Sequence, residues 1–341
     1  MGNRYIRAAK NISMKELIEN FPKQLQEAVT IGKKAAIVKA KNKISNVVVS
    51  GLGGSGIGAN LVSELVFDKL KVPFSIYKDY SLPAFVNKDT LFIASSYSGN
   101  TEETLSALNI ALKKKANIAV VTSGGKVLEI AQQKKLNHVV IPGSNPPRSC
   151  LGYSAVQQLY VLQKMGLIDK SFEQQLLNTI ELLSKEQKNI QEEAKVIAKK
   201  LFNKIPIIYA TADNESVAVR FRQQINENGK MLCWHHVVPE MNHNELVGWR
   251  KKSADWAVVY LRNETDFSRN QSRIEINKTV IKKYSNTILE IWSKGNSKLE
   301  RSFYLIHLTD WVSYYLSELN QVDVTEVKVI DHLKNELSKI K

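Results

Sequence analysis

Cysteine is scarce in this chain, whose 341 residues include only Cys150 and Cys233. Two cysteines build no disulfide framework and no metal cluster. The chain also lacks a long uncharged apolar run of membrane-spanning length. Its first residues lack the apolar core of a signal peptide. These absences predict a cytoplasmic protein with no membrane-spanning segment.

Acidic residues are in short supply as well: 33 Asp and Glu stand against 48 Lys and Arg, a formal net charge of +15. Such an excess favours anionic partners, either nucleic acids or phosphorylated metabolites. The basic residues are scattered along the chain, with no zinc-finger spacing and no aromatic-basic RNA-binding motif. We therefore predict no nucleic-acid partner, and a solvated Lys-rich surface accounts for much of the charge.

Short apolar or β-branched runs alternate with helix-like segments from residue 46 onward. Five runs come before residue 145 and about four come after residue 204, which predicts βαβ units with parallel sheets. Residues 171–203 contain no Gly or Pro and repeat apolar residues at steps of three and four, which predicts one long amphipathic helix. We predict an α/β protein with four parts: a helical segment at 1–45, an αβα sandwich at 46–165, a connecting helix at 166–203, and a second αβα sandwich with two C-terminal helices at 204–341.

Two polar turns follow predicted strands of the first half. The first, "GLGGSG" at 51–56, spells the G-x-G-x-x-G dinucleotide fingerprint, which is weak by itself. An NAD site would need an acid after the next strand, where Asp79 is available. However, Ser55 lies inside the glycine turn, and a second turn rich in hydroxyls follows the third strand; neither is required for a dinucleotide. Together they favour a single sugar phosphate, and we predict no cofactor.

The second turn, "SSYSGNTEET" at 95–104, gathers hydroxyl and amide side chains before a helix. Hydroxyls and the amides of a helix N-terminus can surround a phosphate with donors. A capping box, with Asn100 as the cap and Glu103 at the third helical position, is an alternative interpretation of the same letters. A cap needs only one of these hydroxyls, so both interpretations can hold together.

With "NPPRSCLGY", "QQINENGK" and "EMNHNELVGW" further on, the two turns resemble the bifunctional phosphoglucose/phosphomannose isomerase family. The resemblance extends from about residue 45 to the C-terminus. It implies two sugar isomerase (SIS) domains, each an αβα sandwich with a parallel sheet. It also implies interconversion of glucose 6-phosphate, mannose 6-phosphate or both with fructose 6-phosphate through an enediolate. Finally, it implies a homodimer whose active site is shared between subunits.

The resemblance assigns roles to residues that match the family's motifs. The two turns supply the residues that bind substrate and its phosphate: Gly53, Gly54, Ser55, Ser96, Ser98 and Thr101. Four further residues match catalytic positions: Arg148 the arginine that stabilises the enediolate, Glu227 the catalytic base, His243 the ring-opening histidine from the neighbouring subunit, and Lys334 the C-terminal lysine that lines the site.

The chain departs from the family pattern at two places. "VDVTEV" around Thr325 lacks both prolines of the family's Asp-Pro-Thr-Pro, so Lys328 is a rival to Lys334. Cys150 and Gly152 also stand where more aliphatic residues are typical.

Taken without the family, the catalytic candidates have ordinary alternatives. Glu227 precedes Gly229, the expected C-cap of its helix, and could be an exposed helix-end residue. Arg148 is either a surface arginine or a fixed cation for a developing oxyanion. His243 lies in a polar loop and is either solvated or suited by its near-neutral titration to ring opening.

His235 and His236 occupy an apolar strand, which is typical of packing or polar-network residues. The spacing of the histidines matches neither H-x₃-H nor H-E-x-x-H, so no metal site is predicted. Two other functions stay open: a non-catalytic sugar-phosphate sensor, and an isomerase for another sugar phosphate such as an amino sugar. The presence of Glu227, Arg148 and His243 together favours the enzyme.

Overall fold

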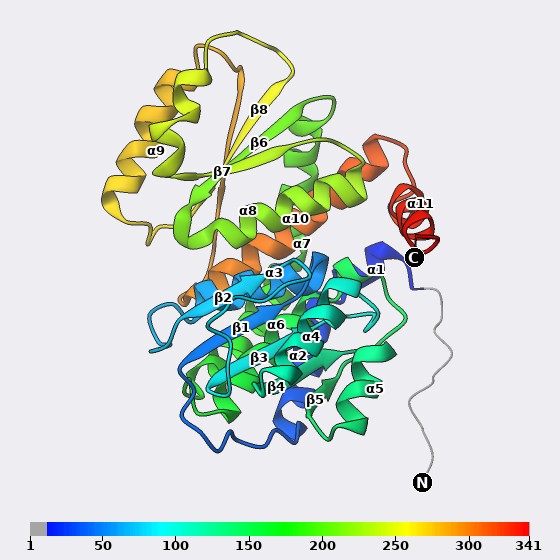
Figure 1. Cartoon of the computed structure of the whole chain (residues 1–341). Coiled ribbons are helices and arrows are strands. Elements are labelled where there is room, and N and C mark those ends of the chain that lie inside the picture. Colours follow the sequence, from blue (N-terminus) through cyan, green and yellow to red (C-terminus); the bar gives the residue numbers. More distant parts are fainter. Residues whose placement is uncertain (1–11, 341) are drawn as a thin grey trace. The chain divides into compact units, whose positions relative to one another are not determined.

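The computed structural model describes residues 12–340 and divides the chain into two compact units (Figure 1). Unit 1 consists of Met1–Glu186 and Lys294–Tyr304, and unit 2 of Gln187–Ser293 and Leu305–Lys341. The long helix predicted at 171–203 is α7, Ser171–Leu201. It contributes to both units, as does α10, Lys298–Leu319.

Unit 1 is built on a parallel five-stranded sheet in the order β2-β1-β3-β4-β5. Its strands are β1 Asn46–Ser50, β2 Phe74–Tyr77, β3 Thr90–Ser95, β4 Asn117–Thr122 and β5 Asn137–Val140. Its helices are α1 Met14–Glu19, α2 Phe21–Lys34, α3 Gly53–Leu65, α4 Glu102–Lys113, α5 Gly125–Gln133 and α6 Leu151–Lys164. The central strands β1, β3 and β4 are continuous apolar runs because helices bury the sheet on both faces.

The layers of unit 1 follow from which apolar side chains pack together. On one face of the sheet, Ala107 and Leu108 of α4 and Val127 of α5 join a core with Val48 and Phe92. On the other face, α3 and α6 contact the sheet and each other, and α2 packs on α6. Unit 1 is therefore an αβα sandwich, as the alternation of runs predicts.

Unit 2 repeats this construction with four parallel strands in the order β7-β6-β8-β9. The strands are β6 Ile205–Thr211, β7 Trp234–Val238, β8 Trp256–Arg262 and β9 Thr287–Trp292, and the helices are α8 Glu215–Gln224, α9 Ser268–Ile281 and α11 Lys328–Leu337 together with α10. One turn of π-helix, Ile225–Gly229, follows α8 directly.

The strand order determines where a ligand can bind. In the order β2-β1-β3-β4-β5 the chain leaves β1 and β3 toward opposite faces, which opens a crevice at their carboxyl ends. Both polar turns identified in the sequence begin there, after β1 and after β3. No helix within residues 12–340 combines the length and the apolar character that crossing a membrane requires.

Candidate active site

The glycine turn after β1 lies directly against a segment from much later in unit 1. A Cβ atom on Gly54 would stand 2.8 Å from the carbonyl oxygen of Pro147 and 3.6 Å from the Cα atom of Arg148. Only glycine allows this approach, because a side chain would collide with the backbone. The contact brings the predicted Arg148 to the glycine turn, from which α3 begins.

The turn after β3 is organised by its own hydroxyls. Ser96 Oγ lies 2.9 Å from Thr101 Oγ1 and accepts from the amide of Gly99 at 3.1 Å. Ser98 Oγ accepts from the amide of Asn100 at 3.3 Å, and the side chain of Ser98 remains exposed. These hydrogen bonds shape the turn so that several hydroxyls lie directly before the first turn of α4.

The capping box predicted for this turn is wrong. Thr101, not Asn100, is the N-cap of α4, and none of the described side chains caps the helix. The carbonyl oxygen of the Asn100 side chain instead accepts from the amide of Lys126 at 3.1 Å, so Asn100 links the turn to α5. The first amides of α4 therefore receive no capping oxygen from residues 12–340.

Ser55 joins the two turns. The Oγ atom of this buried residue accepts from the amide of Tyr97 at 3.1 Å, across the β1/β3 crevice. The turns that carry Gly53, Gly54, Ser55, Ser96, Ser98 and Thr101 therefore meet at the crevice, and the backbone of Arg148 lies against the first of them.

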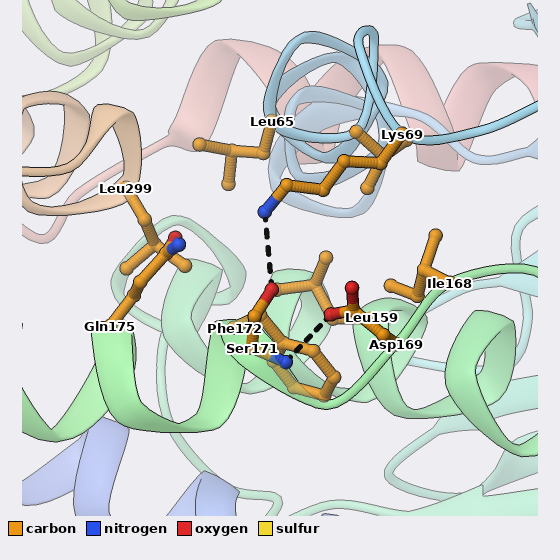
Figure 2. Close-up of a pocket in the computed structure, with 10 residues that line it drawn as sticks. Leu65, Lys69, Leu159, Ile168, Asp169, Ser171, Phe172, Gln175 and Leu299 are labelled. Carbon is orange, nitrogen blue, oxygen red and sulfur yellow. Dashed lines mark hydrogen bonds between the residues drawn. The ribbon is translucent and has the colours of Figure 1, made fainter.

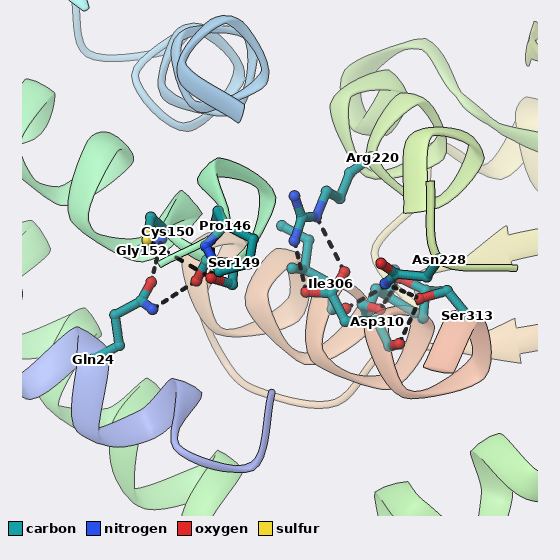
Figure 3. Close-up of polar contacts among 12 residues, drawn as sticks. Gln24, Pro146, Ser149, Cys150, Gly152, Arg220, Asn228, Ile306, Asp310 and Ser313 are labelled. Atoms are coloured by element: carbon teal, nitrogen blue, oxygen red, sulfur yellow. Dashed lines mark hydrogen bonds and ion pairs between the residues drawn. The ribbon is translucent and has the colours of Figure 1, made fainter. Parts of the chain in front are cut away.

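Arg148 is 5% exposed, so its interpretation as a surface arginine is wrong. It belongs to a 3₁₀ turn, Pro147–Ser149, that precedes α6. The side chain of Gln24 on α2 clamps this turn: its Nε2 donates to the carbonyl of Ser149 at 2.7 Å, and its Oε1 accepts from the amide of Gly152 at 2.9 Å (Figure 3). Gln24 is a supporting residue that no sequence motif indicates.

The clamp also explains one departure from the family pattern. A Cβ atom on Gly152 would lie 2.7 Å from Gln24 Oε1 and 3.0 Å from a methyl carbon of Leu25. A larger residue at position 152 would therefore push away the amide that holds the Arg148 segment. Nearby, burial raises the pKa of Tyr97, so its hydroxyl stays protonated.

A cavity elsewhere in unit 1 is too small for substrate. Figure 2 shows it below the C-terminal end of α3, lined by Leu65, Lys69, Phe172 and Leu299 among others. Its volume of ≈ 10 Å³ is about the space of a single water molecule. The polar turns at the opposite end of α3 remain the candidate site.

Glu227 is half-buried in the π-helical turn of unit 2. The C-cap predicted at Gly229 is wrong: Lys230 ends the helix in the left-handed conformation, with φ 56°. The wider π turn moves the chain reversal one residue onward. Lys230 Nζ donates to the carbonyl oxygens of Glu227 at 2.5 Å and Glu326 at 2.6 Å.

His243 is exposed at the end of a 3₁₀ turn, Glu240–His243, whose neighbouring side chains are bound within unit 2. Asn242 Nδ2 donates to Asn277 Oδ1 at 2.6 Å, and Asn244 Nδ2 donates to Glu240 Oε1 at 2.8 Å. The side-chain hydrogen bonds of Asn242 and Asn244 hold the loop in place, and His243 is exposed on it. Asn277, on α9, is a further supporting residue without a sequence signal.

Both candidate lysines, Lys328 and Lys334, lie on α11 and are exposed. The contact between Lys230 and the Glu326 carbonyl ties the start of α11 to the turn that carries Glu227. Lys328 is close in the chain to this contact, whereas Lys334 is more than one helical turn further on.

The remaining candidates have structural partners. Burial lowers the pKa of His235, whose Nε2 lies 3.6 Å from Glu215 Oε1, and His236 Nδ1 accepts from the amide of Val237 at 2.7 Å. Asp79 is exposed, and its carboxylate accepts from the amide of Tyr80 at 2.7 Å within its own turn. Within residues 12–340, no three His, Cys, Asp or Glu side chains cluster in a way that could hold a metal ion.

Comparison with known proteins bears on the whole chain. The family described as "Bacterial phospho-glucose isomerase C-terminal SIS domain" matches residues 190–337. A bifunctional phosphoglucose/phosphomannose isomerase of Caldicellulosiruptor bescii is 43% identical over 342 residues, covering 96% of this chain and 100% of the relative. The Aquifex aeolicus protein of the same name is 36% identical, with 89% of this chain and 93% of the relative covered.

A solved structure supports the fold. The crystal structure of a hypothetical protein from Thermus thermophilus superposes with a TM-score of 0.77 and covers 97% of this chain and 91% of its own. The two sequences are 16% identical, so this likeness concerns the architecture alone.

Proposed function

Because the chain belongs to the bifunctional phosphoglucose/phosphomannose isomerase family, we propose that it interconverts glucose 6-phosphate and mannose 6-phosphate with fructose 6-phosphate. The observation that carries the proposal in this structure is the hydrogen bond from the Tyr97 amide to Ser55 Oγ. It joins the glycine turn and the hydroxyl turn at the β1/β3 crevice, where a parallel sheet of this order binds its ligand. Buried Arg148 lies against the same glycine turn.

The phosphate is held by the turn after β3. Ser96, Ser98 and Thr101 offer hydroxyls, and the N-terminus of α4 offers amides and the positive end of its dipole. Gly53, Gly54 and Ser55 let the backbone approach the sugar from the other side of the crevice. The two sides together recognise one phosphorylated sugar.

The isomerisation is redox-neutral and needs a base, a stabiliser for an oxyanion and help in opening the ring. Glu227 takes the C2 proton of the open-chain aldose and returns it to C1 of the enediolate, giving the ketose. The Arg148 guanidinium stabilises the negative oxygen of that intermediate. His243 transfers the proton that opens the ring, and a lysine of α11, Lys334 or Lys328, lines the site.

The test of this function is turnover of a panel of phosphorylated aldoses in deuterated water. Glucose 6-phosphate and mannose 6-phosphate should both yield fructose 6-phosphate, with deuterium entering at C1 or C2 because the enediolate exchanges its proton with solvent. Tight binding without conversion of any sugar would show a sensor instead. Conversion of an amino-sugar phosphate but of neither hexose 6-phosphate would show that the protein acts on a different substrate.

The shared active site requires a homodimer, and two features of unit 2 support one. His243 is exposed on a braced loop, suited to entering another subunit's site. In addition, α11 carries an exposed apolar stripe: Val329 is 82% exposed, Leu333 57% and Leu337 46%. An apolar helix face of this kind is typical of a protein–protein interface.

Cys150 and Cys233 are both free thiols. Free thiols suit a reducing compartment such as the cytoplasm.

Subunit complementation tests the shared site. Glu227→Gln and His243→Ala subunits are each expected to be nearly inactive, and mixing them should restore activity. With random exchange, half of the dimers are mixed and each has one site with both native groups, so about a quarter of the sites recover. Differently tagged subunits report the exchange. Verified mixed dimers that remain inactive would show that both groups act from one chain.

A further inference from the structure

Within unit 2, buried polar contacts join α10 to α8 and to the π-helical turn that follows α8. Arg220 donates from Nε and Nη2 to the carboxylate of Asp310, at 3.1 and 2.8 Å. Two turns further along the α8 side, Asn228 Nδ2 donates to Ser313 Oγ at 3.0 Å (Figure 3). The Ser313 hydroxyl in turn donates to the carbonyl of Asp310 at 2.7 Å. Asn228 and Ser313 are both fully buried.

Asn228, which makes the contact with Ser313, lies inside the π-helical turn, Ile225–Gly229. The π-helix is rare and appears mostly as a single turn within or after an α-helix, frequently at a functional site. Its persistence needs support from the surrounding structure. Here Asn228 supplies one support from inside the turn, and Asn320 Nδ2, just after the end of α10, supplies another by donating to the Gly229 carbonyl at 2.8 Å.

Asn228 and Glu227 are adjacent in the helical turn, so their side chains point to different sides of it. When the Asn228 amide is held in the buried interface with α10, Glu227 is turned toward the half-buried side of the turn. Without the hydrogen bond between Asn228 and Ser313, the turn would be less constrained and the Glu227 carboxylate could point in other directions. The direction of the Glu227 side chain therefore depends on a hydrogen bond that its neighbour makes.

We propose that Asn228 is a positioning residue for Glu227, acting through its buried hydrogen bond to Ser313 on α10. The proposal rests on the role of Glu227 as the base. Asn228 does not transfer a proton itself; it keeps the π turn in the form that aims the carboxylate at the substrate carbon. Arg220 and Asp310 anchor the same pair of helices upstream of the turn, so the two contacts fix both the separation of the helices and their rotation.

The experiment compares Asn228→Ala and Ser313→Ala with the native protein in steady-state isomerase assays. Because a misplacement of about 1 Å can cost about 100-fold in rate, each variant should lose about 10- to 100-fold in kcat. KM should change little, since the phosphate contacts come from other segments. Ser317→Ala is the matched control: Ser317 is also buried on α10, but its hydroxyl donates to the carbonyl of Tyr314 in its own helix at 2.6 Å.

The second arm repeats Asn228→Ala in a Glu227→Gln background. A residue that acts only through the Glu227 carboxylate should cause no further loss there, because residues that work as a unit are not additive. An equal loss in both backgrounds would show a general effect on the fold and overturn the proposal. So would native kcat in Asn228→Ala while Glu227→Gln is inactive. If Asn228→Ala does not fold, Ser313→Ala decides by the same criteria.

The two failures are distinguishable. Native activity in Glu227→Gln alone would refute the base itself, and the positioning role with it. Loss in Glu227→Gln without loss in Asn228→Ala or Ser313→Ala would refute only the positioning role and leave the function intact.

Discussion

Glu227→Gln should lower kcat by about 10²- to 10⁴-fold, the range over which general acid–base catalysis contributes to rate. Glutamine keeps the shape of the side chain and its place in the π turn, but its amide cannot accept the C2 proton. Substrate binding should persist because the residues proposed to hold the phosphate lie in the turns after β1 and β3. The measurement is steady-state kinetics on glucose 6-phosphate and mannose 6-phosphate, with binding followed by calorimetry.

A matched control is available in the same unit. Glu264 is an exposed glutamate in the turn after β8, so Glu264→Gln removes a carboxylate without touching the proposed site. Its kinetics should equal those of the native protein. Full activity in Glu227→Gln would remove this residue as the base, and the proton transfer would then need a different carboxylate.

Arg148→Met should lower kcat by about 10²- to 10³-fold, comparable to the loss of one oxyanion stabiliser in other enzymes. Methionine fills much of the space of the aliphatic stem but has no charge. The charge that we propose Arg148 offsets develops only in the enediolate, so kcat and kcat/KM should fall together. Because Gln24 clamps the turn through backbone groups of Ser149 and Gly152, the segment itself should keep its place.

Arg148→Lys separates charge from geometry. Lysine restores a cation but not the planar fork of guanidinium donors, so an intermediate rate is expected. Arg269→Met on α9 changes an exposed arginine and should have no kinetic effect, which controls for net charge. A native kcat in folded Arg148→Met, with the melting temperature unchanged, would contradict the assignment of Arg148 as the oxyanion stabiliser.

The secondary structure was largely predictable because its signals are local. The runs that form β1, β3 and β4 are apolar throughout, since both faces of the sheet are covered. The helical repeat of α7 persists over 31 residues without glycine or proline. The family resemblance likewise rests on short motifs, and comparison with relatives over nearly the full chain confirms it.

The errors fall where a distant residue competes with a local rule. Asn100 is of a residue type that often caps helices, but its side-chain oxygen accepts a hydrogen bond from the amide of Lys126. Gly229 has the letters of a C-cap, but the π turn moves the cap to Lys230. At Asn100, a contact between segments outweighs an N-cap preference worth about 1 kcal/mol.

The sequence by itself determined the α/β class and the order of strands and helices, because periodicity and turn chemistry act over a few residues. Its short motifs carried the family resemblance. Only the tertiary structure decided that the two turns meet through Ser55 and Tyr97, that Arg148 is buried behind the Gln24 clamp, and that Glu227 sits in a π turn held by α10. These features depend on hydrogen bonds and close packing between segments up to 128 residues apart in the chain, and no pattern within a single segment records such contacts.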